Sequence, residues 1–312
     1  MGKASKAKRE GSSRQQRIAA QRAAARRTEI RNRILIASGS VVVVIAIVLA
    51  FVLVKVNSNG SSSSSSSANG PTGAALATVV KNTTTVPAST LATVGAGSVT
   101  SPPASLTNGT PLTSGGKPEM LYIGAEYCPY CAFERWGMVV ALSRFGTFKG
   151  LSTTHSSSTD QFPNTPTWTF YKSSYTSKYL AFSSVEETNN QLASNGQGYT
   201  PLQTPTAAQQ ALIAKYDAPP YVASASKGAI PFVYVGGKYL ITGASATPSV
   251  LAGKTWASIA SSLKDPGNAV SKAVNGTANY ITAAICKTTG NQPSNVCTPG
   301  VTALQSKMKT AG

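Results

Sequence analysis

Two cysteines separated by two residues are the part of this sequence best suited to chemistry. Cys128 and Cys131 enclose Pro129 and Tyr130. The thiolate is the reactive form of cysteine, and the N-terminus of a helix favours it because unpaired N–H groups and the helix dipole lie there. A second thiol one turn further along can attack a mixed disulfide formed at the first. The spacing therefore indicates dithiol–disulfide exchange, in which Cys128 attacks and Cys131 resolves.

The residues around the pair predict the elements that would position it. The apolar run over residues 120–123 is typical of a buried strand, and residues 132–145 have the pattern of a helix. Pro129 suits the first helical turn, because its missing N–H would have had no partner within the helix. The expected order is strand, short loop, cysteine pair and helix.

A zinc site is the main alternative for a Cys-x-x-Cys pair, since half of such a site has the same spacing. Zinc needs two further ligands, but His155 is the only histidine and the other cysteines lie in a separate C-terminal segment. The scarcity of His and Met weakens a copper-delivery role in the same way. We therefore expect no metal and no cofactor beyond the cysteine pair, and we interpret His155 as a loop residue.

A second informative stretch covers residues 229–243. Gly236 and Gly237 stand between two β-rich runs, which predicts a two-residue hairpin because both positions can take positive φ. Pro231 opens the first of these strands, where a missing N–H is tolerated. Further strands are predicted over 151–154, 167–171 and 179–185, and helices over 206–216 and 255–263.

This order of elements resembles the thioredoxin superfamily, and the Cys-Pro-Tyr-Cys motif and the Ile230-Pro231 hairpin carry the resemblance. It implies that Pro231 is cis and faces the cysteines, and that the backbone of Ile230 is free to pair with a substrate chain. The long spacing between the two motifs is similar to that of the disulfide-bond-forming (Dsb) relatives, which carry a helical insertion. The Pro-Tyr dipeptide is similar to that of glutaredoxins.

The wider pattern resembles an uncharacterised prokaryotic family of membrane-anchored thioredoxin-like proteins. It consists of an anchor, a Ser/Thr tether, residues 124–131, residues 134–136 and a late cysteine pair. The sequence also departs from thioredoxins. Tyr127 replaces the tryptophan that they place before the first cysteine, and no buried Asp ahead of the motif is evident as a proton acceptor for Cys131. Glu126 is adjacent but expected near the surface, and no glutathione-binding residues can be assigned.

The other two cysteines, Cys286 and Cys297, enclose a polar loop with Gly and Pro that follows a predicted helix. A disulfide across this loop would stabilise the fold by roughly 2–3 kcal/mol on the chain-entropy model. A second redox pair is the alternative, but neither cysteine opens a helix. We expect a structural disulfide.

The N-terminal part has the composition of a membrane anchor. Residues 1–33 hold eleven Lys or Arg and two Glu, and residues 34–54 carry no charge, a length that spans a hydrocarbon core of roughly 30 Å. A nucleic-acid arm and a cleaved signal peptide are the alternatives, but the run is longer than a usual signal core and no clear cleavage site follows. The predicted parts are a basic cytoplasmic tail (1–33), a transmembrane helix (34–54), a Ser-rich linker (55–73) and an extracytoplasmic thioredoxin-like domain (74–312, with its core at 119–265 and a C-terminal extension at 266–312).

The expected fold class is thus α/β: a thioredoxin-like fold with a helical insertion and a C-terminal helical extension, preceded by one transmembrane helix. The expected function is a single-pass, cell-membrane thiol–disulfide oxidoreductase that exchanges disulfides with exported proteins, with a possible membrane electron-transfer partner and no nucleic acid. The direction of electron flow stays open. The alternative is a non-enzymatic thioredoxin-like interaction module with structural disulfides.

Overall fold

The computed structural model describes residues 70–194 and 197–311, and its centre is a mixed β-sheet. Strand β3 (Lys117–Gly124) pairs in parallel with β8 (Ala181–Glu186) and antiparallel with β11 (Phe232–Val235). Strand β11 continues through a tight turn into β12 (Tyr239–Thr242). Because β3 has neighbours on both sides and its second half is covered on both faces, residues 120–123 are a continuous apolar run rather than an alternating one.

Short strands extend this sheet with segments that are far apart in the sequence. Strand β1 (Ala104–Leu106) pairs antiparallel with β12, and β13 (Thr310–Ala311) pairs in parallel with β1. Strand β2 (Thr113–Ser114) pairs with the beginning of β3. The C-terminal strand β13 is therefore hydrogen-bonded to β1, which is the first strand of the sheet in the sequence.

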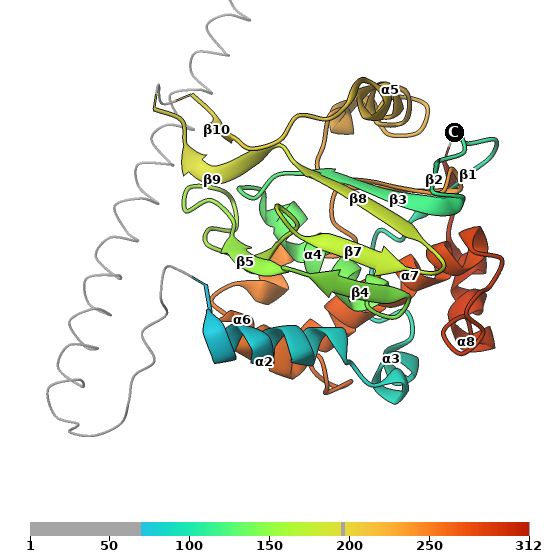
Figure 1. Ribbon diagram of the computed structural model, residues 1–312, viewed down its shortest axis with the longest axis horizontal. Helices are drawn as coiled ribbons and strands as arrows, with labels where there is room; N and C mark the ends of the chain where they lie inside the picture. The colour runs from blue at the N-terminus through green and yellow to red at the C-terminus, as the bar shows by residue number, and fades with distance from the viewer. Residues whose placement is uncertain (1–69, 195–196, 312) are drawn as a thin grey trace, which may run out of the picture. The chain divides into compact units, whose positions relative to one another are not determined.

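The two faces of the sheet have separate cores, and alternate residues of β3 contribute to each. Met120 and Tyr122 belong to the larger core and Leu121 and Ile123 to the smaller one. Figure 1 shows α5 over one face, with the helices of the larger core on the other. The helices are α2 (Gly73–Thr84), α3 (Ala88–Val94), α4 (Pro129–Leu142), α5 (Ala207–Tyr216), α6 (Trp256–Ser262), α7 (Ala269–Thr288) and α8 (Pro299–Thr302), with 3₁₀ turns η1 (Ser224–Ser226), η2 (Pro248–Leu251) and η3 (Ala303–Lys307).

Helix α4 is held between the sheet and α7, and close contact with α7 depends on a glycine. A Cβ at Gly137 would come within 2.5 Å of the Thr277 Cγ2 atom. Helix α2 packs against α6 and α4, and its Val79 is buried in the larger core. The segment ahead of β3 is therefore part of the same folded unit as the cysteine helix.

The segment between α4 and β11 contains the predicted inserted helix, α5, and also several short strands ahead of it. Aromatic and β-branched residues favour strands here, and a ring cluster around Phe148, Phe170 and Phe182 packs them together. The predicted strand at 151–154 exists but lies outside the central sheet. The three two-stranded ladders are β4 (Gly146–Lys149) with β7 (Ser174–Ser177), β5 (Ser152–His155) with β6 (Pro166–Thr169), and β9 (Thr188–Leu192) with β10 (Tyr199–Pro201).

Several local predictions are confirmed. Gly236 and Gly237 join β11 to β12 with φ of 56° and 78°, as a tight hairpin requires. The predicted helices at 206–216 and 255–263 correspond to α5 and α6. Each begins at a threonine whose side chain accepts a hydrogen bond from the third helical residue, a capping pattern readable in the sequence.

The prediction of a membrane span is corrected. Across residues 70–194 and 197–311, no helix combines the length and the apolar composition that crossing a bilayer requires. Helix α7 is 20 residues long but carries Lys272, Asn275 and Lys287. The predicted span at 34–54, with the tail before it and most of the linker after it, lies outside the described residues. For the described residues the predicted fold class is corrected to mixed α/β without a membrane-spanning helix, and the finding does not support the predicted single-pass localisation in the cell membrane.

Candidate functional site

Cys128 is the N-cap residue of α4, and its sulfur lies where the helix needs an acceptor. The Sγ atom accepts a hydrogen bond from the backbone N–H of Cys131 at 3.3 Å. Pro129 follows as the first helical residue, where no N–H is required. The Cys128 side chain is buried except for about 5% of its surface. The helix N-terminus therefore holds this sulfur just below the surface.

The two thiols have opposite electrostatic environments. A hydrogen bond from the Cys131 thiol lowers the pKa of Cys128, and the backbone N–H of Cys131 and the charge of Arg135 act in the same direction against the effect of burial. Complete burial raises the pKa of Cys131, and the hydrogen bond and negative charge of Cys128 raise it further. Both thiols are free. The arrangement favours a thiolate at Cys128 and a protonated thiol at Cys131.

The loop ahead of β11 lies against the sulfur of Cys128. The Cys128 thiol donates to the carbonyl oxygen of Ile230 at 3.7 Å, and the Ile230–Pro231 peptide bond is cis. The Pro231 carbonyl accepts from the N–H of Gly243 at 2.9 Å, which ties the loop to the residue after β12. The structure thus brings together the cysteines and the Ile230-Pro231 pair, which are about a hundred residues apart in the sequence.

Aromatic side chains surround the cysteine pair. Tyr127 stacks on Tyr199 of β10 with ring centres 4.1 Å apart, and Tyr130 meets the edge of Phe162 at 6.0 Å. The hydroxyl of Tyr130 donates to Gln161 Oε1 at 2.8 Å. All four rings are half-buried. The residue directly before the first cysteine is therefore one member of a stacked tyrosine pair.

A buried ion pair lies beneath the cysteines, and sequence reasoning missed it. Arg135 and Glu186 are both completely buried, with Arg135 Nη1 2.9 Å from Glu186 Oε2. The same Nη1 donates to the Ala125 carbonyl at 3.2 Å and to the Tyr122 hydroxyl at 2.9 Å. Glu186 Oε1 accepts from the N–H of Phe170 at 3.3 Å. The available signal was a pair of adjacent charged residues one helical turn after Cys131 in an otherwise apolar stretch.

Burial and the neighbouring charge act on this ion pair in opposite directions. Burial raises the pKa of Glu186 to about 7, although the positive charge of Arg135 and the hydrogen bond from Phe170 lower it. Burial also raises the pKa of Tyr122, so its hydroxyl stays protonated. The Glu186 pKa therefore lies closer to neutral pH than that of an ordinary carboxyl group.

Glu134, the neighbour of Arg135, is directed to a different element. Its carboxylate accepts from the N–H and the hydroxyl of Ser245, at 2.9 and 3.0 Å, in the loop after β12. Glu134 is completely buried, and burial raises its pKa to about 7. Glu134 thus connects α4 to the loop after β12. Gly243, at the beginning of this loop, donates its N–H to the Pro231 carbonyl.

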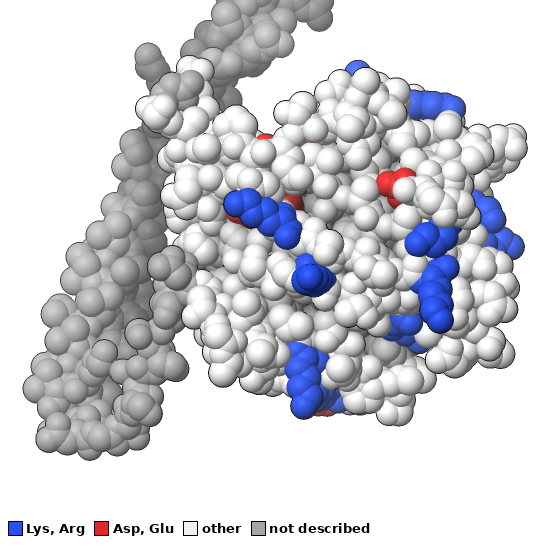
Figure 2. Space-filling model, viewed as in Figure 1, with Lys and Arg blue, Asp and Glu red and all other residues white. Residues whose placement is uncertain are grey.

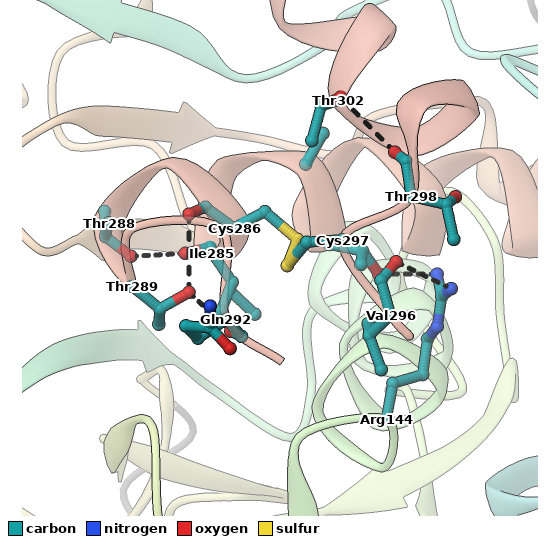
Figure 3. Close-up of a disulfide and its surroundings, with 12 residues drawn as sticks. Arg144, Ile285, Cys286, Thr288, Thr289, Gln292, Val296, Cys297, Thr298 and Thr302 are labelled. Carbon is teal, nitrogen blue, oxygen red and sulfur yellow. Dashed lines mark hydrogen bonds between the residues drawn. A yellow bond between two sulfur atoms is a disulfide. The ribbon is translucent and has the colours of Figure 1, made fainter. Parts of the chain in front are cut away.

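The second cysteine pair forms a disulfide at the end of α7. Cys286 and Cys297 are joined with Cα atoms 5.6 Å apart, and both are buried. Figure 3 shows Cys286 on the helix, Cys297 on the returning loop, and Arg144 beside that loop. Arg144 Nη2 donates to the Val296 carbonyl at 3.4 Å. The Cys286–Cys297 disulfide closes a polar loop and holds the C-terminal residues against α7.

The described residues contain no cluster of three or more His, Cys, Asp or Glu side chains that could hold a metal ion. His155 lies at the end of β5, with Nδ1 2.8 Å from the Ser156 carbonyl and the Asn190 side chain alongside.

On the face shown in Figure 2, most of the surface of the described residues is uncharged, with separate Lys and Arg side chains.

A protein-family model described as "Domain of unknown function (DUF929)" matches residues 105–287. The match covers more than half of the chain, from the beginning of the sheet to the residue after Cys286, and includes the cysteine pair and Pro231. No curated protein and no solved structure matches the chain.

Proposed function

The chain belongs to the DUF929 family, a family of unknown function, and we propose that it is a thiol–disulfide oxidoreductase of the thioredoxin superfamily. Its substrates in this proposal are the thiols and disulfides of other proteins. Cys128 and Cys131 are the reacting groups, Pro231 and Ile230 form the opposite wall of the site, and Pro129 and Tyr130 support the motif. No cofactor besides the cysteine pair takes part.

The unequal environments of the two thiols carry this proposal. Cys128 lies at a helix N-terminus, accepts an N–H at 3.3 Å and has a lowered pKa, while Cys131 is fully buried with a raised pKa. Thiol–disulfide exchange needs one nucleophilic thiolate that a substrate can reach and one protected thiol that waits for the second step. A structural disulfide needs no such difference.

The reaction follows from this arrangement. The Cys128 thiolate attacks a substrate disulfide, which gives a mixed disulfide and one substrate thiolate. Cys131 then loses its proton and attacks the Cys128 sulfur, which releases the second substrate thiolate and leaves the Cys128–Cys131 disulfide. The substrate gains two electrons and the protein loses two. The reverse sequence oxidises a dithiol, and the redox partner sets the direction.

The connections around the site support the thioredoxin part of the proposal. Strand β3 leads into the cysteine helix, its parallel neighbour β8 comes later, and the β11–β12 hairpin follows after the insertion. Pro231 stands immediately before β11, and the Ile230 carbonyl is 3.7 Å from the Cys128 sulfur. These are the features on which the sequence resemblance rested.

Trapping of the mixed disulfide tests the proposal, with insulin as the disulfide substrate. The Cys131→Ser variant should accumulate a covalent adduct with an insulin chain through Cys128, because the resolving thiol is missing. The Cys128→Ser variant is the matched control and should form little adduct, because Cys131 is buried.

Two results would reject the proposal. One is that neither variant forms an adduct while both remain folded, which would leave the interaction module with structural disulfides as the better reading. The other is equal adduct formation by the two variants, which would remove the distinction between attacking and resolving thiols.

A further inference from the structure

The second step of the proposed reaction needs a proton acceptor inside the protein. Cys131 must become a thiolate before it can attack the mixed disulfide, yet its side chain has no exposed surface. Bulk water therefore cannot take the proton directly. The inference that follows rests on the proposed function and names the groups that remove this proton.

Tyr122 places a hydroxyl beside the Cys131 sulfur. Gly124 lies between the two groups and has an ordinary backbone conformation, but a Cβ there would collide with the Tyr122 hydroxyl and lie 3.0 Å from Cys131 Sγ. Glycine is needed at this position because these two atoms occupy the space that a side chain would fill. The hydroxyl and the sulfur are therefore neighbours in a buried pocket of β3 and α4.

The same hydroxyl continues into the buried ion pair. Tyr122 Oη accepts from Arg135 Nη1 at 2.9 Å and donates toward Glu186 Oε2 at 3.4 Å. An oxygen with one donor on it still has a second lone pair available for the Cys131 thiol. The hydroxyl thus hydrogen-bonds to the carboxylate and lies across the space at Gly124 from the Cys131 sulfur, a position from which it can accept the Cys131 proton.

We propose that Tyr122 relays the proton of the Cys131 thiol to Glu186 during resolution of the mixed disulfide. The Cys131 proton moves to the Tyr122 oxygen while the Tyr122 hydroxyl proton moves to Glu186 Oε2. Tyr122 is unchanged after the transfer, Glu186 becomes a carboxylic acid, and the Cys131 thiolate displaces the substrate thiolate from Cys128. Arg135 holds the hydroxyl and the carboxylate in line and stays charged throughout.

The other carboxylates near the site have different partners. Glu126 accepts from the hydroxyls of Thr169 at 2.5 Å and Thr154 at 3.4 Å, and Glu134 accepts from Ser245. Glu186 is the carboxylate that shares a hydrogen bond with Tyr122. Its pKa of about 7 suits a group that must gain and lose a proton near neutral pH.

A single-turnover reaction with the aromatic disulfide DTNB separates the two steps. Attack by Cys128 releases one thionitrobenzoate ion, and resolution by Cys131 releases the second, so absorbance shows two phases. In Tyr122→Phe we expect an unchanged first phase and a second phase slowed by about 10²-fold at pH 7.

Two further variants complete the test. Tyr234→Phe is the matched control, since Tyr234 is an equally buried tyrosine whose hydroxyl donates to the Thr110 carbonyl at 2.7 Å, and both phases should stay at wild-type rates. Glu186→Gln keeps a hydrogen-bonding side chain but cannot take the proton, so it should also slow the second phase alone. It serves as the second test if Tyr122→Phe does not fold.

The outcomes distinguish this inference from the proposed function. If the wild-type protein shows no second phase, the proposed function fails. If the wild type shows both phases and a folded Tyr122→Phe resolves within about 2-fold of wild type from pH 6 to 9, the relay is wrong and the oxidoreductase proposal stands.

Discussion

Cys128 and Cys131 belong to the same helical turn but differ in what surrounds each sulfur. The Cys128 sulfur accepts an N–H and retains a small exposed surface, whereas Cys131 is enclosed. The lowered pKa of Cys128 means that reduced protein carries a thiolate at lower pH than an ordinary cysteine does. A stabilised thiolate favours the reduced state of a dithiol, so it makes the corresponding disulfide a stronger oxidant.

The pH dependence of alkylation should show this difference. When reduced protein reacts with iodoacetamide, we expect Cys128 to be modified with an inflection below the ordinary thiol value of 9.0, and Cys131 to stay largely unmodified. Peptide mass mapping after reaction at pH 4 to 9 measures both sites separately.

The Cys131→Ala variant is the control for the cause of the shift. It removes the thiol hydrogen bond, which is the largest contribution, so the Cys128 inflection should rise toward 9.0. An inflection at or above 9.0 in the wild type would contradict the proposed thiolate.

Helix α4 carries the cysteines, and two consecutive buried charges fasten it to different parts of the fold. Arg135 reaches β8 through Glu186, and Glu134 reaches the loop after β12 through Ser245. Gly137 then allows close contact with α7. The helix is thus attached on several sides, which keeps the cysteine pair in a constant position relative to Pro231.

Glu134 should make stability depend on pH in a defined window. Its pKa is about 7 in the folded protein and about 4.5 in the unfolded chain, so only the folded state holds this proton between those values. The contribution is therefore fully present below pH 4.5 and is lost as pH rises through 7. In Glu134→Gln the amide oxygen can accept from the N–H of Ser245 while the amide N–H donates to the Ser245 hydroxyl, without ionisation.

Urea unfolding at pH 4.5 and pH 8 measures the effect. Wild type and Glu134→Gln should have similar unfolding free energies at pH 4.5, and the variant should be more stable at pH 8 by an amount on the order of 1–3 kcal/mol. A variant that is less stable than wild type at pH 8 would show that the ionised carboxylate stabilises the fold, contrary to this account.

In the molecule as a whole, the predictable parts were those with local signals. The strand before Cys128, the helix after it and the Gly236-Gly237 hairpin each follow from a few adjacent residues, and the structure has all three. The capping threonines of α5 and α6 are equally local. The expectation that Pro231 faces the cysteines came instead from the resemblance to the thioredoxin superfamily.

The remaining features depend on contacts between distant residues. Glu186 pairs with Arg135 across 51 positions, so no spacing rule could identify it as part of the site. The ladders between α4 and β8 pair β4 with β7 and β5 with β6. In the first ladder, Phe148 and Tyr175 also pack against Phe182 of β8, which lies far from β4 in the sequence. Strands were predicted at 151–154 and 167–171, but nothing in their residues indicated that the two would pair with each other outside the central sheet.

The reduction potential of the Cys128–Cys131 pair tests the central claim most directly. Equilibration of the whole chain in glutathione buffers of varied ratio, followed by acid quenching and mass mapping, gives the oxidised fraction of each cysteine pair. The Cys286–Cys297 disulfide in the same digest serves as the structural reference. Exchange proteins lie between about −120 and −270 mV, and we expect the Cys128–Cys131 pair to lie in this range. A potential below about −300 mV, typical of structural disulfides, would contradict the proposal that this pair exchanges disulfides with other proteins.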